Sequence, residues 1–194
     1  MAVAAEANKA LPIEWAAALT ARFASAAPYD VLFALYRQRG ASWNKDTQGY
    51  MLAYLVRWNP GRALPLLEAA LPADAPAPDF NMAYAIGKMG YIPGIDSFWR
   101  ERLAGGPAMA AQAAFEMSQT GPKEDQAILR SRLNDWRTQW QGREIPPSEG
   151  KFEGELTQAV MMGAHWQMAK DDMQALGAGC LSAICRSRFE GQIK

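Results

Sequence analysis

Residues 50–71, YMLAYLVRWNPGRALPLLEAAL, contain two apolar stretches at helical spacing, separated by the turn Asn59-Pro60-Gly61. Residues 82–103, MAYAIGKMGYIPGIDSFWRERL, follow the same order, and so do residues 110–133, AAQAAFEMSQTGPKEDQAILRSRL. In each segment an Ala-rich first stretch meets a turn that carries Asn-Pro, or Gly with Pro, and the second stretch ends in a leucine. The three segments therefore predict three consecutive helical hairpins.

The spacing of the hairpins indicates a repeat. The closing leucines are Leu71, Leu103 and Leu133, at intervals of 32 and 30 residues. Periods of this size arise when helical hairpins stack, because one hairpin alone cannot bury its apolar face. Over roughly residues 44–141 the chain resembles the HEAT-like and armadillo-like repeat family. The resemblance implies an α-solenoid in which second helices line a concave surface that holds the partner.

We predict an all-α fold: a single domain of about five antiparallel hairpins, stacked as a short right-handed superhelix. The composition agrees, because Ala occurs 36 times whereas Val, Ile and Thr together occur 17 times, which disfavours a sizeable sheet. A compact helical bundle without a repeat is the alternative. The predicted hairpins cover residues 12–39, 44–71, 79–104, 107–141 and 151–189, with loops at 72–78 and 142–150. In the last hairpin the two helices are expected at 151–169 and 171–189.

The charge and hydropathy of the chain limit the kind of partner that it can bind and the cellular compartment in which it is expected. The chain has 20 Lys+Arg and 20 Asp+Glu, a formal net charge of zero, whereas dedicated nucleic-acid binders carry a basic surface. No run of about 18 residues lacks charged or polar side chains, so membrane insertion is not expected. The first ten residues lack the basic start and the apolar run of a signal peptide. These features favour a cytoplasmic location but leave the compartment and the oligomeric state open.

The two cysteines, Cys180 and Cys185, are five residues apart within one predicted helix. That spacing places them on different sides of a helix, too far apart for an unstrained disulfide. A cysteine pair without an accompanying histidine also fits no zinc template. We expect two small buried side chains, with no disulfide and no metal.

No catalytic motif is present, since the chain has no GxSxG, no phosphate loop and no dinucleotide-binding fingerprint. The single histidine, His165, is expected to be partly buried on a Met-rich helix rather than to act as a general base. Glu124 and Asp125 open a predicted helix, where negative charge favours the helix dipole. Glu153 and Glu155 lie on different faces of one helix and cannot share a metal. We expect a protein that is not an enzyme and has no cofactor.

Seven tryptophans are a high number for a chain of this length. Four of them continue apolar stripes and are expected in the core, namely Trp58, Trp99, Trp136 and Trp140. The apolar pattern does not place the other three, Trp15, Trp43 and Trp166. Any of these that is exposed is a candidate contact with a partner.

Ten of the 13 arginines fall in the second helices of the predicted hairpins. In solenoids of the family that the chain resembles, an arginine ridge on that face would bind carboxylates or phosphates with bidentate geometry. The simpler explanation is that cations are favoured near helix C-termini. The candidate partner-binding residues are Arg100, Arg102, Arg130, Arg132 and Arg137.

Three functions are compatible with these observations. The leading hypothesis is a non-catalytic helical-repeat scaffold that binds a protein partner or peptide segment on the concave, Arg-bearing face. The first alternative is a HEAT-like nucleic-acid-binding protein or a DNA glycosylase-like enzyme, for which Asp135 with Trp136 and Trp140 is the only local candidate site. The zero net charge disfavours that alternative. The second alternative is a helical domain that belongs to a larger protein.

Overall fold

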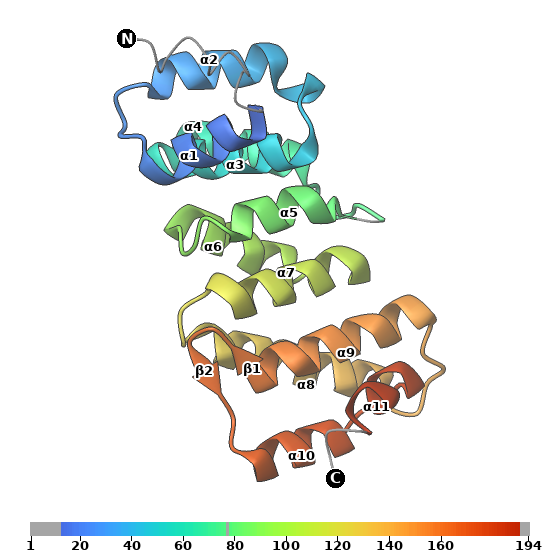
Figure 1. The fold of residues 1–194 in the computed structure, drawn as a ribbon. Helices are drawn as coiled ribbons and strands as arrows, with labels where there is room; N and C mark the ends of the chain where they lie inside the picture. The colour runs from blue at the N-terminus through green and yellow to red at the C-terminus, as the bar shows by residue number, and fades with distance from the viewer. Residues whose placement is uncertain (1–12, 77, 191–194) are drawn as a thin grey trace, which may run out of the picture.

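The computed structural model describes residues 13–76 and 78–190, and these residues form an all-helical fold (Figure 1). They contain eleven α-helices, one short 3-10 helix and a hairpin of two two-residue strands. The predicted all-α class is confirmed. The elements are α1 (Ile13–Phe23), α2 (Tyr29–Arg39), η1 (Gly40–Ser42), α3 (Lys45–Trp58), α4 (Pro60–Ala70), α5 (Phe80–Gly87), α6 (Pro93–Arg102), α7 (Pro107–Thr120), α8 (Asp125–Trp140), α9 (Pro147–Met161), β1 (Met162–Gly163), β2 (Trp166–Gln167), α10 (Lys170–Ala178) and α11 (Ala183–Phe189).

The helices lie in two rows. In the first row α1 packs on α3, α3 on α5, α5 on α7, and α7 on α9. The second row consists of α2, α4, α6 and α8, each of which packs against one or two helices of the first row. Figure 1 shows the first row running down the molecule from α1 to α9, with α10 and α11 at the far end. None of the helices in the described ranges has the length and apolar character needed to cross a membrane.

Local signals in the sequence account for many helix starts. The side chains of Asn44, Asn59 and Asp79 accept backbone N–H bonds at the first turns of α3, α4 and α5, which satisfies donors that have no partner within the helix. Prolines occupy the first position of several helices, where the missing N–H has no effect, namely Pro60, Pro93, Pro107 and Pro147.

The Ala-rich first helices are those that pack most closely. In α7, Ala110, Ala113 and Ala114 are completely buried. Where α3 crosses α5, a Cβ added to Gly49 would lie 2.5 Å from the carbonyl oxygen of Met82, so only glycine permits this approach. The small side chains therefore serve to bring the first-row helices together, and large side chains such as Trp99 and Trp136 fill the remaining core.

The prediction of a last helical hairpin over residues 151–189 is wrong. Helix α9 begins at Pro147, within the predicted loop 142–150, and ends at Met161 rather than Ala169. The chain then forms the β1–β2 hairpin, which is held to α7 because the Ala164 N–H donates to the Ser118 carbonyl at 2.7 Å. His165 occupies the exposed turn of this hairpin and is not on a helix, so the prediction that it is partly buried is also wrong.

The cysteine prediction is wrong in one respect. Both side chains are buried, as expected, but Cys180 and Cys185 form a disulfide with a Cα–Cα distance of 5.6 Å. The predicted continuous helix 171–189 is broken after Ala178, and Ser182 caps a new helix, α11. The cysteines therefore belong to different elements, and the helical spacing that separated them does not apply.

The tryptophans divide differently from the prediction. Trp99 and Trp136 are buried, as expected, and Trp140 is partly buried. Trp58, expected in the core, is 43% exposed because it is the last residue of α3. Among the three less constrained tryptophans, only Trp15 is exposed, at 64%.

Candidate partner-binding site

The five predicted arginines lie on two adjacent helices of the second row, α6 and α8. Two of them have equivalent contacts in successive hairpins. The Nε of Arg102 donates to the carbonyl of Leu71 at 3.1 Å, and the Nε of Arg132 donates to the carbonyl of Leu103 at 3.2 Å. Leu71 and Leu103 are the C-cap residues that directly follow α4 and α6. Each arginine therefore caps the C-terminus of the preceding second-row helix, which stabilises carbonyls that have no partner within their own helix.

Substitution of these two capping arginines by methionine, Arg102→Met and Arg132→Met, should each lower the free energy of unfolding by about 1–2 kcal/mol. Methionine retains an apolar stem but leaves the carbonyl of Leu71 or Leu103 without its donor. The control is Arg130→Met on α8, because Arg130 is exposed and should change stability by less than about 0.5 kcal/mol. Urea denaturation of the three variants tests this, and equal effects at all three positions would contradict the capping role.

Arg100 is held by two carboxylates. Its Nη2 lies 2.9 Å from Asp96 on the same helix and 2.6 Å from Asp125 at the start of α8. Asp125 is fully buried, and this burial together with the neighbouring Asp96 raises its pKa, while Arg100 opposes the rise. The two acids and one arginine thus form a charged contact between α6 and α8. Sequence reasoning had explained Asp125 by the helix dipole alone, because its partners come from another hairpin.

Arg137 is also committed to contacts within the chain. Its guanidinium lies 3.4 Å from the buried carboxylate of Glu153 on α9 and donates to the Leu176 carbonyl of α10 at 3.0 Å. Burial lowers the pKa of Arg137, and the Glu153 carboxylate opposes that change. Of the five predicted residues, only Arg130 is exposed, and its Nη2 lies 3.5 Å from the Met168 sulfur. The structure therefore places the five arginines on two neighbouring helices and directs four of them toward the protein itself.

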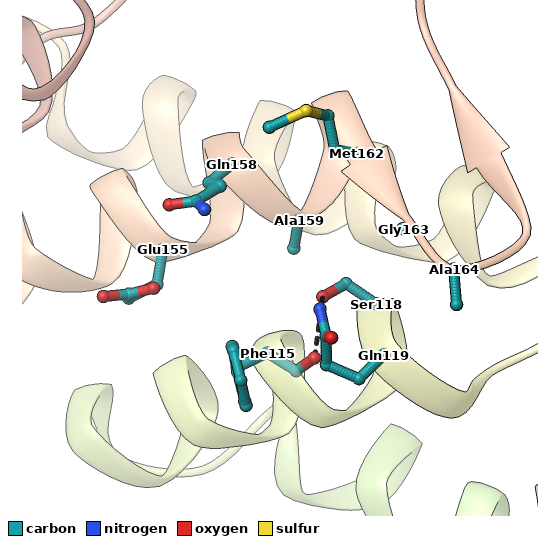
Figure 2. A pocket seen from close by; sticks show the side chains of 9 residues that line it. All are labelled: Phe115, Ser118, Gln119, Glu155, Gln158, Ala159, Met162, Gly163 and Ala164. Atoms are coloured by element: carbon teal, nitrogen blue, oxygen red, sulfur yellow. Dashed lines mark hydrogen bonds between the residues drawn. The ribbon is translucent and has the colours of Figure 1, made fainter. Parts of the chain in front are cut away.

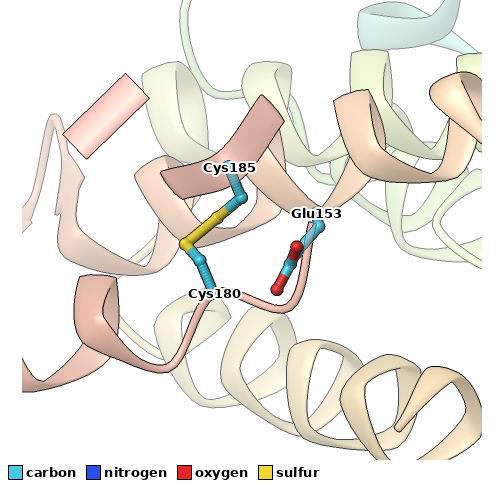
Figure 3. Close-up of side chains that lie close together, drawn as sticks. All are labelled: Glu153, Cys180 and Cys185. Carbon is cyan, nitrogen blue, oxygen red and sulfur yellow. A yellow bond between two sulfur atoms is a disulfide. The ribbon is translucent and has the colours of Figure 1, made fainter. Parts of the chain in front are cut away.

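Glu153 and the disulfide form the only group of potential metal ligands found among the described residues (Figure 3). The carboxylate accepts the backbone N–H of Leu181 at 2.7 Å and that of Ser182 at 2.8 Å. The sulfurs of Cys180 and Cys185 are bonded to each other, and a metal would require them as thiolates. In this oxidised form the group holds the loop between α10 and α11 against α9 and offers no metal-binding chemistry.

A pocket of about 300 Å³ lies between α7, α9 and the β1–β2 hairpin (Figure 2). Its wall includes Phe115, Gln119 and Gln158, with Ala159 directed into the gap between the two helices. Glu155 at the edge pairs with Arg188 at 3.0 Å. The Ser118 hydroxyl donates to the Phe115 carbonyl within its own helix at 2.7 Å and accepts a hydrogen bond from the Gln119 amide at 3.3 Å.

A second, larger groove of about 490 Å³ lies on the second row, between α2 and α4. Its lining combines two cations, an anion, an amide and an aromatic ring, namely Asp30, Phe33, Ala34, Arg37, Gln38 and Arg62. The guanidinium of Arg62 stacks on the Phe33 ring, 4.4 Å from its centroid, and lies 2.7 Å from the Asp30 carboxylate. These side chains are open to solvent, with 49% of Arg62 and 83% of Asp30 exposed.

Sequence reasoning counted Arg37 and Arg62 among the second-helix arginines but did not select them. The remaining groove residues were missed. The helical spacing in α2 could have shown which of its residues lie together. Asp30, Ala34 and Gln38 share one face of the helix. Phe33 and Arg37 share the neighbouring face. The position of Arg62 opposite that face depends on how α4 packs, which the spacing does not contain.

The candidate site for the glycosylase alternative is not assembled. Asp135 is exposed on α8, whereas the neighbouring Trp136 is buried and donates its Nε1–H to Glu149 at 2.7 Å. Asp135 lines neither the α7–α9 pocket nor the α2–α4 groove. His165, on its exposed turn, likewise lines neither of them.

Comparison with known proteins adds no assignment, because no known protein family, curated protein or solved structure matches this chain.

Proposed function

We propose that this protein is a non-catalytic helical-repeat scaffold, of the HEAT-like or armadillo-like kind, that binds a segment of a protein partner on its second-row face. The observation that carries the proposal is the groove between α2 and α4. At about 490 Å³ it is larger than the pocket between α7, α9 and the β1–β2 hairpin, and it places two exposed arginines beside an aromatic ring. Stacked rows of helices present such a surface ready formed, which keeps the ordering cost of binding low.

The chemistry of the groove selects an acidic segment. Arg37 and Arg62 can each bind a carboxylate with two parallel N–H bonds, and the Phe33 ring offers an apolar contact beside them. Asp30 shows that a carboxylate can reach this guanidinium, since its Oδ1 lies 2.7 Å from the Nη1 of Arg62 in a single contact. That ion pair is exposed and is therefore worth at most about 1 kcal/mol, so a partner carboxylate can replace it.

The test uses a random-peptide display library selected on the intact chain. The selected peptides should be rich in Asp and Glu beside an aromatic or aliphatic residue. Reversal of both groove charges, Arg37→Glu with Arg62→Glu, should weaken their binding by more than tenfold. Removal of the internal competitor, Asp30→Asn, should strengthen it about twofold to fivefold. Fluorescence titration of labelled peptides gives both numbers.

The matched control makes the same change of charge elsewhere. Lys123→Glu with Lys151→Glu alters two exposed cations outside the groove and should leave peptide affinity within about twofold once salt screens long-range effects. Equal losses in both double variants would mean that only overall charge matters. Selected peptides that bind the Arg37/Arg62 variant as well as the parent would overturn the proposal.

A further inference from the structure

The loop that carries Cys180 and Cys185 is held by hydrogen bonds as well as by the disulfide. Between the two cysteines, the backbone N–H groups of Leu181 and Ser182 donate to the Glu153 carboxylate, which Figure 3 shows beside the disulfide. The Ser182 side chain accepts the Cys185 N–H at 3.1 Å and fixes the start of α11. A disulfide stabilises most when it closes a long loop, and these cysteines are only five residues apart. The hydrogen bonds should therefore keep the two sulfurs close together after the disulfide is reduced.

The two sulfurs have different surroundings. The Nη2 of Arg137 lies 3.9 Å from the Cys180 sulfur, whereas the Cys185 sulfur lies 3.6 Å from the neutral hydroxyl of Thr157. A guanidinium beside a thiol favours the thiolate, which is the reactive form. Cys180 is also the more accessible residue, at 5% exposed against 0% for Cys185. Cys180 is therefore the cysteine suited to react first, with Cys185 as the second thiol beside it.

Other charges near Cys180 do not cancel the effect of Arg137. The Glu153 carboxylate lies within 4.8 Å of both sulfurs and disfavours a thiolate, but it is itself paired with Arg137 at 3.4 Å and with two backbone N–H groups. From α11, the Arg186 guanidinium donates to the Cys180 carbonyl at 3.3 Å and adds a second positive charge. The charged residues of α10 all lie in its first turn, at the opposite end of that helix.

We propose that Cys180 and Cys185 are a peroxide-reactive thiol pair and that the disulfide is the product of their reaction. Both sulfurs belong to a small apolar cluster with Met161 and Phe189, separate from the main core. The low exposure of Cys180 selects a small oxidant, hydrogen peroxide, over a protein disulfide that would have to approach a buried sulfur. The same burial keeps the oxidised Cys180 close to Cys185 and shielded from further peroxide.

The reaction has two steps. The Cys180 thiolate attacks one peroxide oxygen, so that an S–O bond forms, the O–O bond breaks and the departing hydroxide takes a proton to become water. Cys180 is then a sulfenic acid, oxidised by two electrons. The Cys185 sulfur attacks the Cys180 sulfur, an S–S bond forms, and hydroxide leaves and becomes water with the proton from Cys185. Two thiols and one peroxide thus give one disulfide and two waters, and a small dithiol reverses the oxidation by supplying two electrons and two protons.

The first experiment measures the rate of this reaction on the full chain. The protein is reduced with dithiothreitol, freed of reductant, and mixed with hydrogen peroxide in the presence of a metal chelator. Both thiols of each chain should be lost together, with a mass decrease of two hydrogens. The second-order rate constant should exceed that of free cysteine at the same pH by about tenfold or more.

A second experiment identifies the cysteine that reacts first. Cys185→Ser removes the second thiol, so peroxide should leave Cys180 as a sulfenic acid that dimedone labels. Cys180→Ser should react no faster than free cysteine, because Cys185 has no exposed surface and no guanidinium beside it. Peptide mass spectrometry gives the labelled position.

Variants of Arg137 test its effect on the Cys180 thiolate. Arg137→Met should slow the peroxide reaction by about fivefold or more, and Arg137→Lys, which retains the charge, should restore most of the rate. The parent rate should fall only below about pH 7, whereas the rate of Arg137→Met should already fall below about pH 8.5, the ordinary value for cysteine. Arg130→Met, at an exposed arginine of the same helix, is the control and should match the parent.

Four outcomes would overturn the proposal. A reduced chain that loses its helical circular dichroism shows that the loop depends on the disulfide. A parent rate equal to that of free cysteine shows that the thiols are not activated. Dimedone labelling that is absent from Cys180 removes its role as the reacting thiol. Equal rates for Arg137→Met and Arg130→Met remove the role of the guanidinium. The dimedone experiment does not depend on the folding of any Arg137 variant.

Discussion

Replacement of Glu153 by alanine is expected to lower the free energy of unfolding by about 3–5 kcal/mol. Glu153 is fully buried on α9, accepts the backbone N–H groups of Leu181 and Ser182, and lies 3.4 Å from the Arg137 guanidinium. Its removal leaves two backbone donors and one buried cation without their acceptor. Each of these desolvated groups carries its own penalty.

Two further variants, Glu153→Gln and Glu155→Ala, show whether the loss of stability comes from the buried carboxylate of Glu153. Glu153→Gln retains the shape and one acceptor oxygen, so it should lose about half as much stability as the alanine variant. Glu155→Ala removes an ion pair with Arg188 whose side chains are 23% and 36% exposed, and it should change stability by at most about 1 kcal/mol. Chemical denaturation measures all three. Similar losses for Glu153→Ala and Glu155→Ala would contradict the role assigned to the buried carboxylate.

The second large effect is a loss of stability as the pH rises. Glu116 on α7 is almost completely buried and accepts a hydrogen bond from Gln112 at 2.8 Å. Burial raises its pKa from an ordinary value of 4.5 to about 8, which the Gln112 bond partly opposes. The folded chain therefore holds a proton that the unfolded chain releases near pH 4.5. The resulting stabilisation is complete below about pH 4.5 and is lost as the pH rises through about 8.

Glu116→Gln tests this dependence, because glutamine resembles the protonated acid and does not ionise. The variant should be about as stable as the parent at pH 4.5 and about 3–5 kcal/mol more stable at pH 9. The difference between the two proteins is the relevant quantity, since the other titrating groups are common to both. Glu124→Gln, at an exposed carboxyl before α8, should show no such divergence. Parallel stability curves for the parent and Glu116→Gln would show that Glu116 is ionised in the fold.

Most of the helical architecture could be predicted because its signals are local. Prolines at helix starts, capping Asn and Asp side chains and the period of apolar residues all act within a few residues of the elements that they define. The end of α9 at Met161 has a different origin. Trp166 donates its Nε1–H to the Ala159 carbonyl at the end of α9, and the Ala164 N–H donates to the carbonyl of Ser118, which is 46 residues earlier on α7, so the β1–β2 hairpin depends in part on a distant residue.

In the candidate site, too, the sequence shows the local pattern but not the contacts between residues far apart in the chain. The concentration of arginines in second helices is visible in the sequence, but their acceptors lie about 30 residues earlier, at Leu71 and Leu103. A pattern that was interpreted as a partner-binding ridge is, for Arg102 and Arg132, a set of contacts between successive hairpins. The α2–α4 groove could not be found from spacing alone, because Arg62 reaches it from the neighbouring helix.

These arginine contacts also determine how the chain can be divided. Arg102 joins α6 to the end of α4, and Arg132 joins α8 to the end of α6. A fragment cut between any two of these hairpins keeps either a carbonyl without its donor or a guanidinium without its acceptor. Each hairpin thus depends on its neighbour for part of its stability, so unfolding that begins at one end is passed along the row. These hairpins are therefore not independent units of stability.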